Sequence, residues 1–181
     1  MNLPNLISLG RLLSVPVAIW LVLSGELAGA FWLFVASGVS DAVDGFIAKR
    51  FDQRTRLGAL LDPLADKALL VSVYVTLGIG GYLPNWLVIL VVFRDVLIVG
   101  GWLLVAGLGQ RMRWEPLYVS KLNTALQIGL IAVVLARLGL GLRDFGLVVV
   151  LTYGVGATTV ISGAGYLVRW AGALAGVETD T

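Results

Sequence analysis

Residues 37–67 read SGVSDAVDGFIAKRFDQRTRLGALLDPLADK, and this stretch joins the end of one apolar run to the start of the next. Asp41 and Asp44 are three residues apart, so on a helix they share one face. Asp62 and Asp66 are four residues apart and share a face in the same way. A connection of about ten residues favours antiparallel neighbouring helices, on which the four aspartates can converge.

Apolar residues dominate the rest of the chain. Of its 181 residues, 59% are hydrophobic and only 13% are charged, whereas soluble domains are roughly 45–50% apolar and about 25% charged. A water-soluble fold of this length could not bury so much apolar surface. The composition therefore predicts an all-α integral membrane protein, and it excludes a soluble enzyme and a disordered chain. The net charge of +2 does not favour nucleic acid as a partner.

Six apolar runs are long enough to cross a bilayer, which takes about 20 residues in a helix. They cover approximately residues 6–24, 27–48, 59–80, 84–108, 119–137 and 145–168. Glycine, proline and polar residues separate them, as is typical of turns. Little of the chain remains for a soluble domain. We therefore expect residues 1–181 to form a single polytopic membrane domain, a bundle of six transmembrane helices.

Basic residues predict the orientation of these helices, because they concentrate on the cytoplasmic side. One side of the predicted bundle carries Arg11, Lys49, Arg50, Arg54, Arg56, Arg111, Arg113, Lys121 and Arg169. The opposite side carries only Arg137 and Arg143. We expect a multi-pass protein of the cell inner membrane, with both termini and the aspartates facing the cytoplasm.

The first apolar run has a second interpretation. Arg11, the apolar residues 12–23 and Ala28-Gly29-Ala30 resemble a secretory signal with a small-residue cleavage site. We favour an uncleaved helix, because Ala28 already belongs to the next apolar run and the positive flank is a single residue.

The four aspartates are too costly to lie in lipid by chance. Each costs about 2.5–3.5 kcal/mol at the centre of a lipid-facing helix, and two carboxylates 4 Å apart repel by about 4 kcal/mol at an effective dielectric constant near 20. They therefore need a wet cavity and a counter-charge. The chain has no Cys and no His, and oxygen ligands alone favour Mg²⁺, Mn²⁺ or Ca²⁺. At the cytoplasmic side, such a site indicates Mg²⁺ or Mn²⁺ with a phosphate-bearing substrate.

Small residues lie beside the aspartates, and Gly45, Ala48 and Gly58 would leave room for that substrate to approach the backbone. The alternative is a solvated helix end in which the aspartates pair with the neighbouring basic residues. Four acids with glycines in phase on both helices favour the metal site.

The order and spacing of these residues resemble a family motif. Asp41-x2-Asp44-Gly45-x2-Ala48-Lys49-x8-Gly58-x3-Asp62-x3-Asp66 resembles the pattern D-x2-D-G-x2-A-R-x8-G-x3-D-x3-D of the CDP-alcohol phosphatidyltransferases. Seven of the eight fixed residues match, and every spacing fits. The departure is Lys49, where the family has Arg, with Arg50 directly after it. Lys keeps the charge but lacks the bidentate fork of Arg, which leaves open whether Lys49 or Arg50 grips the pyrophosphate.

The resemblance implies a six-helix membrane enzyme, usually a homodimer, that transfers the phosphatidyl group of CDP-diacylglycerol to an alcohol and releases CMP. It implies two divalent ions that hold the pyrophosphate, with Asp41, Asp44 and Asp62 as ligands. Asp66 would be a further ligand or the general base. The residues implied to contact the CDP-lipid are Gly45, Ala48, Lys49, Arg50 and Gly58.

Two further features bear on the alcohol acceptor. Arg94-Asp95 lies about halfway along the fourth run, where an ion pair either fixes helix packing or lines an anion-binding acceptor pocket. Lys121 opens the fifth run and either binds an acceptor phosphate or is a snorkelling anchor at the membrane surface.

Residues 93–98 and 119–127 resemble cardiolipin synthases more than phosphatidylglycerophosphate synthases. The latter tend to carry Arg-Glu in place of Arg94-Asp95 and an extra Lys in place of Asn123. That Lys suits the dianion of glycerol 3-phosphate, whereas phosphatidylglycerol presents a monoanionic diester. We therefore expect phosphatidylglycerol as the acceptor and cardiolipin as the product, with glycerol 3-phosphate as the alternative acceptor.

A hypothesis of another class is an ion or proton-coupled transporter that uses the same carboxylates. It predicts acids near the middle of the bilayer and often an inverted repeat. The aspartates lie at the ends of the predicted helices, and the sequence shows no repeat, so we favour the transferase.

Overall fold

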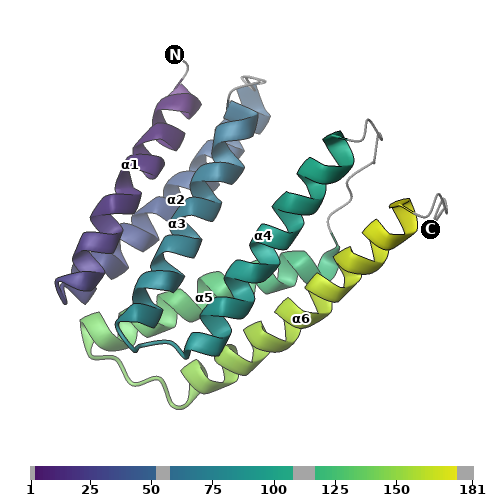
Figure 1. The fold of residues 1–181 in the computed structure, drawn as a ribbon. Helices are drawn as coiled ribbons and strands as arrows, with labels where there is room; N and C mark the ends of the chain where they lie inside the picture. Colours follow the sequence, from purple (N-terminus) through teal and green to yellow (C-terminus); the bar gives the residue numbers. More distant parts are fainter. Residues whose placement is uncertain (1–2, 52–57, 108–116, 175–181) are drawn as a thin grey trace. The chain divides into compact units, whose positions relative to one another are not determined.

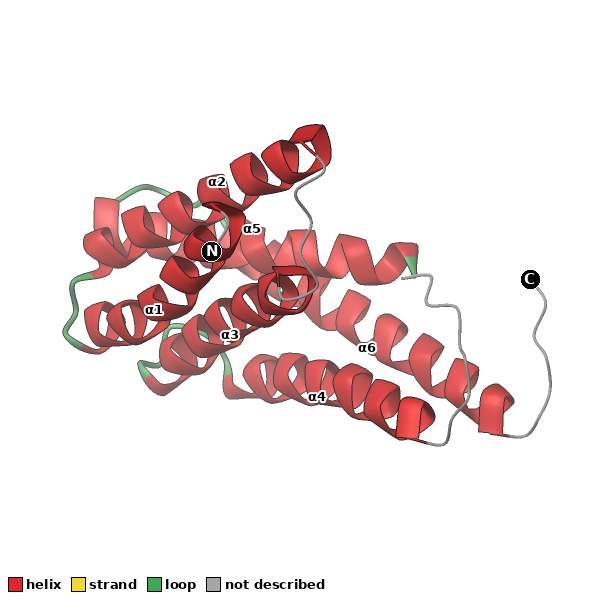
Figure 2. Cartoon of the chain, turned by 90° about the horizontal axis from the view of Figure 1, so that it is seen from above, coloured by secondary structure: helices red, strands yellow, loops and turns green. Residues whose placement is uncertain are grey.

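The structure is a computed structural model that describes residues 3–51, 58–107 and 117–174, with side chains described for 10–41, 67–101 and 117–172. These residues form six α-helices and no strand (Figure 1, Figure 2). The helices are α1 (Leu3–Leu23), α2 (Leu27–Phe51), α3 (Gly58–Ile79), α4 (Asn85–Gly107), α5 (Tyr118–Leu140) and α6 (Leu147–Leu174). The all-helical expectation is confirmed, since one helix falls on each predicted apolar run, although the helix ends differ from the predicted ones.

Two helices in the described part of the chain are long and apolar enough to cross a membrane. They are Tyr118–Leu140 and Leu147–Gly172. The prediction that six helices span the bilayer stays a prediction.

The turn between α1 and α2 is closed by a glycine in the left-handed region. Gly25 has φ +77°, a conformation that glycine adopts without steric cost. The backbone N–H of Glu26 donates to the carbonyl of Leu21 at 2.9 Å, which satisfies an orphan carbonyl at the helix end. This short turn makes α1 and α2 antiparallel neighbours.

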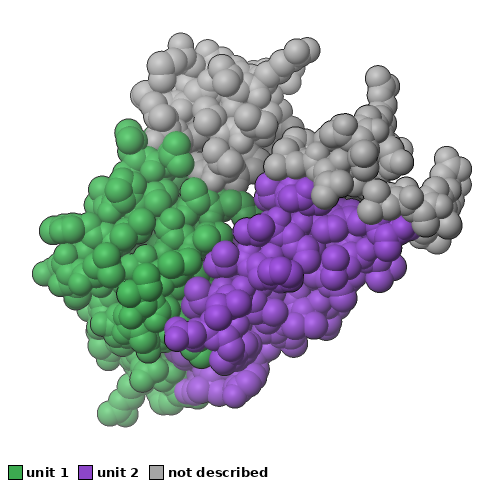
Figure 3. Space-filling view, in the orientation of Figure 1, with its two compact units in different colours: residues 1–84, 131–145 green, residues 85–130, 146–181 purple. Residues whose placement is uncertain are grey.

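Contacts divide the chain into two compact units, coloured separately in Figure 3. Unit 1 comprises Met1–Pro84 and Ile131–Phe145, and unit 2 comprises Asn85–Leu130 and Gly146–Thr181. The expected single membrane domain stays a prediction.

In unit 1, α1 packs against both α2 and α3. Buried apolar side chains of α1 and α3 form much of its core, among them Ala18, Val22, Leu69, Leu70, Val73, Tyr74 and Leu77. The end of α2 and the start of α3 lie at the same end of the unit as the start of α1 (Figure 1, Figure 2). This is the end that carries the aspartate motif.

The second half of α5 also belongs to unit 1 and lies against the start of α2. A Cβ atom at Gly139 would lie 2.5 Å from the backbone nitrogen of Ala28 and 2.5 Å from the carbonyl carbon of Leu27. Because both neighbours are backbone atoms, only glycine fits at this position.

In unit 2, α4 and α6 pack together through tryptophan rings that lie on glycines. Near the start of both helices, a Cβ at Gly156 would lie 2.9 Å from the ring of Trp86. Further along both helices, a Cβ at Gly101 would lie 2.0 Å from the ring of Trp170. Early residues therefore meet early residues and later residues meet later ones, so α4 and α6 run parallel.

Candidate active site

Asp41, the first aspartate of the motif, lies in α2 and is bound by an arginine of α1. Arg11 Nη1 donates a hydrogen bond to Asp41 Oδ1 at 2.9 Å. The Arg11 side chain is 3% exposed, whereas that of Asp41 is 50% exposed. The pair thus joins a buried cation to a half-exposed carboxylate.

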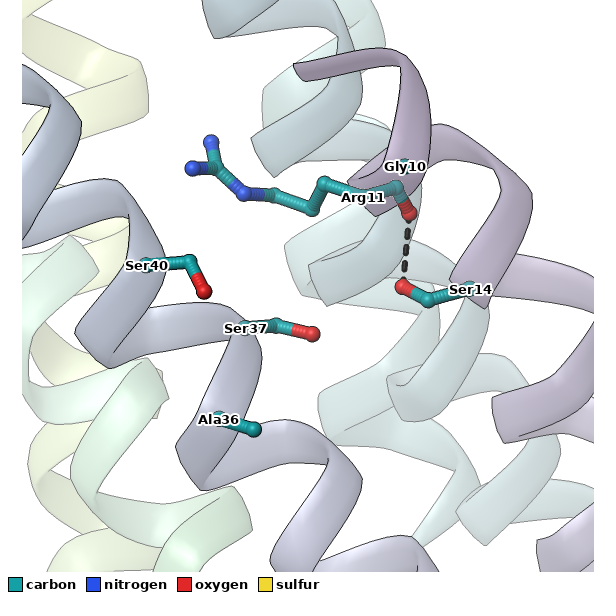
Figure 4. A pocket seen from close by; sticks show the side chains of 6 residues that line it. All are labelled: Gly10, Arg11, Ser14, Ala36, Ser37 and Ser40. Carbon is teal, nitrogen blue, oxygen red and sulfur yellow. Dashed lines mark hydrogen bonds between the residues drawn. The ribbon is translucent and has the colours of Figure 1, made fainter. Parts of the chain in front are cut away.

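A cavity of about 230 Å³ lies beside this pair, between α1 and α2 (Figure 4). Its lining residues are Gly10, Arg11, Ser14, Ala36, Ser37 and Ser40. In Figure 4 the Arg11 side chain reaches from α1 toward α2, and the Ser37 hydroxyl of α2 points toward α1. The Ser14 hydroxyl donates to the backbone carbonyl of Arg11 at 2.6 Å. The cavity therefore combines one guanidinium with serine hydroxyls, next to Asp41.

The other motif residues lie in α2 and α3, but their side chains are outside the described residues. These residues are Asp44, Gly45, Ala48, Lys49, Arg50, Gly58, Asp62 and Asp66. The helix bounds place the first five near the end of α2 and the last three in the early part of α3. Both stretches belong to the same end of unit 1, and the convergence of the four carboxylates stays a prediction.

The chemistry of the donor set suits a hard divalent cation. Asp41 offers a half-exposed carboxylate held in place by Arg11, and its three motif partners are also aspartates. The whole chain contains no His and no Cys. Oxygen ligands of this kind are those that Mg²⁺ and Mn²⁺ take in proteins. The residues present therefore fit such an ion.

Arg94 is buried in unit 2, where neighbours from three helices bind its guanidinium. Nη1 donates to Asp95 Oδ1 at 2.7 Å. Nε and Nη2 donate to the Ser162 hydroxyl of α6 at 3.3 Å and 2.9 Å, and Nη2 also donates to the Ser120 hydroxyl of α5. These contacts connect α4 with α5 and α6 inside unit 2. The alternative role of Arg94, binding the acceptor, stays a prediction.

Lys121 and Asn123 lie one turn into α5 and differ in their surroundings. Lys121 is exposed, and its Nζ lies 5.6 Å from the centroid of the Tyr118 ring. Asn123 is fully buried, and its Oδ1 accepts hydrogen bonds from the hydroxyls of Thr158 at 2.8 Å and Thr159 at 3.0 Å. A neutral hydrogen-bonded amide therefore occupies position 123. The acceptor-binding role of Lys121 stays a prediction.

Sequence reasoning did not find the pairing of Arg11 with Asp41, because it considered Arg11 as a residue that orients the first helix or flanks a signal segment, and not as a partner of the motif. The two residues are 30 positions apart. They lie at nearly equal distances in sequence from the turn at Gly25. In an antiparallel helix pair, two residues at such positions lie at the same level, so their opposite charges could have predicted the contact. Nothing comparable in the sequence identifies Ser120 and Ser162 as partners of Arg94.

Comparison with known proteins gives one family. A family model described as CDP-alcohol phosphatidyltransferase matches residues 1–170. The chain is 34% identical over 188 residues to the chloroplastic CDP-diacylglycerol–glycerol-3-phosphate 3-phosphatidyltransferase 1 of Oryza sativa subsp. japonica, a match that covers 94% of this chain and 57% of that protein.

Two further relatives are named cardiolipin synthase (CMP-forming). The protein of Streptomyces coelicolor is 35% identical over 136 residues, which cover 72% of this chain and 61% of the relative. The human protein is 32% identical over 151 residues, which cover 75% of this chain and 50% of the relative. The matches thus span from half to about three-fifths of these relatives' lengths. Since the family model covers residues 1–170, nearly the whole sequence, this chain belongs to the CDP-alcohol phosphatidyltransferase family.

Proposed function

We propose that this chain transfers the phosphatidyl group of CDP-diacylglycerol to the hydroxyl of an alcohol and releases CMP. One observation carries the proposal: the complete set of motif aspartates, from Asp41 to Asp66, occurs in a chain that matches the family model over residues 1–170. A carboxylate-based transporter gains no support from that match.

In this proposal the motif residues divide the work of binding the CDP-lipid. Asp41, Asp44, Asp62 and Asp66 would hold two Mg²⁺ or Mn²⁺ ions, which when bound neutralise charge on the pyrophosphate and on the attacking and leaving oxygens. Lys49 or Arg50 would bind the pyrophosphate through its positive charge. The small residues that leave room for the substrate are Gly45, Ala48 and Gly58.

The chemical step is a single in-line displacement. The acceptor oxygen forms a bond to the phosphorus that carries the diacylglycerol, and the bond from this phosphorus to the bridging oxygen breaks. CMP leaves with the bonding electrons, and the proton of the acceptor hydroxyl passes to Asp66 as general base. Because the chain has no Cys and no His, a covalent enzyme intermediate lacks a strong nucleophile.

We also propose that all six helices cross the inner membrane, that the site faces the cytoplasm, and that the chain forms a homodimer. In a chain whose successive helices alternate in direction, α4 and α6 point the same way, and their packing is indeed parallel. Large apolar side chains of α4 are exposed, including Ile89, Phe93 and Val96. These faces suit lipid, in which the diacylglycerol tails remain during the reaction.

Phosphatidylglycerol is the acceptor that we propose, with cardiolipin as the product. The neutral, buried Asn123 favours it, because a dianionic glycerol phosphate would gain from a positive charge at this position. The Streptomyces and human relatives carry the name of this activity. Glycerol 3-phosphate is the second candidate, favoured by the similarity to the rice protein over 94% of the chain.

The test uses purified protein, labelled CDP-diacylglycerol and one acceptor at a time. We expect CMP release and labelled cardiolipin with phosphatidylglycerol, and neither product without an acceptor. Labelled phosphatidylglycerophosphate with glycerol 3-phosphate would instead establish the second candidate. Absence of CMP release with both acceptors, from folded protein supplied with Mg²⁺ or Mn²⁺, would refute the proposed function.

A further inference from the structure

We infer that Arg11 is a positioning residue, which acts through Asp41 by holding its carboxylate in the orientation that a divalent ion requires. The inference rests on the proposed function, because it takes Asp41 as a metal ligand. It adds to the motif a residue of α1, a helix that carries none of the motif aspartates.

The contact between the two side chains has the geometry of a positioning interaction. Arg11 Nη1 lies 2.9 Å from Asp41 Oδ1, within the range of charge-assisted hydrogen bonds. Only 3% of the Arg11 side chain is exposed, so its guanidinium is held by packing. Half of the Asp41 side chain remains open. The arginine therefore fixes the carboxylate without enclosing it.

The helix that carries Arg11 is packed on two sides. Arg11 projects from α1, which packs against both α2 and α3, the two helices that carry the motif. Partners that orient the ligands of a metal are typically worth about 10–100-fold in metal affinity or activity. Through Arg11, the packing of α1 can thus set the position of one ligand on α2.

The cavity beside the pair makes the inference testable by chemical rescue. Arg11 itself lines this space of about 230 Å³, together with small and hydroxyl-bearing residues. Truncation of Arg11 to Ala enlarges the space and removes the cation. A free guanidinium ion of the same charge and hydrogen-bonding geometry can then enter and face Asp41.

The first experiment measures the turnover number at saturating Mg²⁺ with three variants. For Arg11→Met we expect kcat to fall about 10–100-fold, with the KM for CDP-diacylglycerol nearly unchanged. Arg11→Lys is expected to recover part of the loss, because it restores charge without the fork. Millimolar guanidinium is expected to raise kcat of Arg11→Ala and to leave the wild type unchanged.

A matched control is Arg137→Met, which removes a different arginine of unit 1. Arg137 Nη1 lies 3.6 Å from Asp144 Oδ2, and the Arg137 side chain is 53% exposed. It pairs with an acid outside the motif, so we expect its loss to leave kcat unchanged. An equal loss of kcat in Arg11→Met and Arg137→Met would overturn the inference. So would a failure of guanidinium to raise kcat of Arg11→Ala, or a kcat of Arg11→Lys no higher than that of Arg11→Met.

The second experiment needs no turnover and measures the rise in the thermal unfolding midpoint when Mn²⁺ is added to EDTA-treated protein. Arg11→Met is expected to lose most of this rise, and Arg137→Met to keep it. A rise in Arg11→Met equal to that of the wild type would mean that Arg11 does not affect ion binding. A larger rise would mean that Arg11 repels the ion. Either result would overturn the inference. If the wild type binds Mn²⁺ with this dependence on Arg11 but releases no CMP, the proposed function fails and the positioning role stands.

Discussion

Replacement of Arg94 by Met tests whether this buried arginine serves the packing of unit 2 or binds the acceptor. Arg94 is 2% exposed and Asp95 is 6% exposed. The single substitution therefore removes the Arg94 guanidinium but leaves the Asp95 carboxylate inside unit 2. The double substitution, Arg94→Met with Asp95→Leu, removes both buried charges together.

The two variants differ in stability because removal of Arg94 alone leaves the buried Asp95 carboxylate without this counter-charge, whereas the double substitution removes both charges. Loss of one partner of a buried ion pair costs about 3–5 kcal/mol, which for a chain of this size lowers the unfolding midpoint by roughly 6–20 °C. Apolar replacement of both partners is often neutral or stabilising. The hydroxyls of Ser120 and Ser162 can then bond to carbonyls of their own helices. We therefore expect the double variant to recover most of the stability that the single variant loses.

The assay combines thermal unfolding in detergent with CMP release at varied acceptor concentration. If Arg94 binds the acceptor, the double variant is stable but has a raised KM for the acceptor and an unchanged KM for CDP-diacylglycerol. If Arg94 serves packing, the double variant is both stable and active. A single variant as stable as the double variant would refute the reasoning from burial.

Three further predictions concern the proposed chemistry and the packing of α5. Asp66→Asn removes the proposed base and should lower CMP release by about 100–10,000-fold, while near-normal release from folded protein would exclude this role. EDTA should abolish CMP release, and added Mg²⁺ or Mn²⁺ should restore it, so turnover that survives chelation would contradict the metal site. Gly139→Ala places a Cβ 2.5 Å from backbone atoms of Leu27 and Ala28, and we expect a loss of stability of about 1–3 kcal/mol. The control is Gly129→Ala on the same helix, where a Cβ would have nothing within 4 Å. It should be neutral or stabilising by up to about 1 kcal/mol. Equal thermal unfolding midpoints for the two variants would show that the close approach of α5 to α2 is absent.

The helices could be predicted from the sequence because a long apolar run has few structural alternatives to a helix. Their ends could not be predicted as well. α2 continues to Phe51 and α6 to Leu174, beyond the predicted ends at residues 48 and 168. Lys49, Arg50 and Arg169 lie in these extensions, and Lys and Arg are good helix formers that lipid nevertheless disfavours. The predicted ends lie where the apolar residues stop, whereas a helix ends where its backbone hydrogen bonds stop.

The site could be predicted only where its residues lie close in sequence. The spacing of the motif aspartates assigns them to two helix faces, as the helix bounds allow. The partners of Arg94 lie 26 and 68 positions away, at Ser120 and Ser162. Such contacts depend on how helices pack and on which rotamers fit, and neither follows from the periodicity of one sequence. The contact between Arg11 and Asp41 is easier to predict than those of Arg94, because the short turn between their helices brings the two residues to the same level.

The tryptophan at the later contact between α4 and α6 has a consequence for experiment. Trp170 lies on Gly101, its ring centroid is 6.2 Å from that of Tyr166, and its indole N–H is buried with no hydrogen-bond partner among the described residues. An indole shielded in this way emits at shorter wavelength than one in water. In a variant that retains Trp170 as its single tryptophan, fluorescence would report the separation of these two helices as a red shift, without any attached dye.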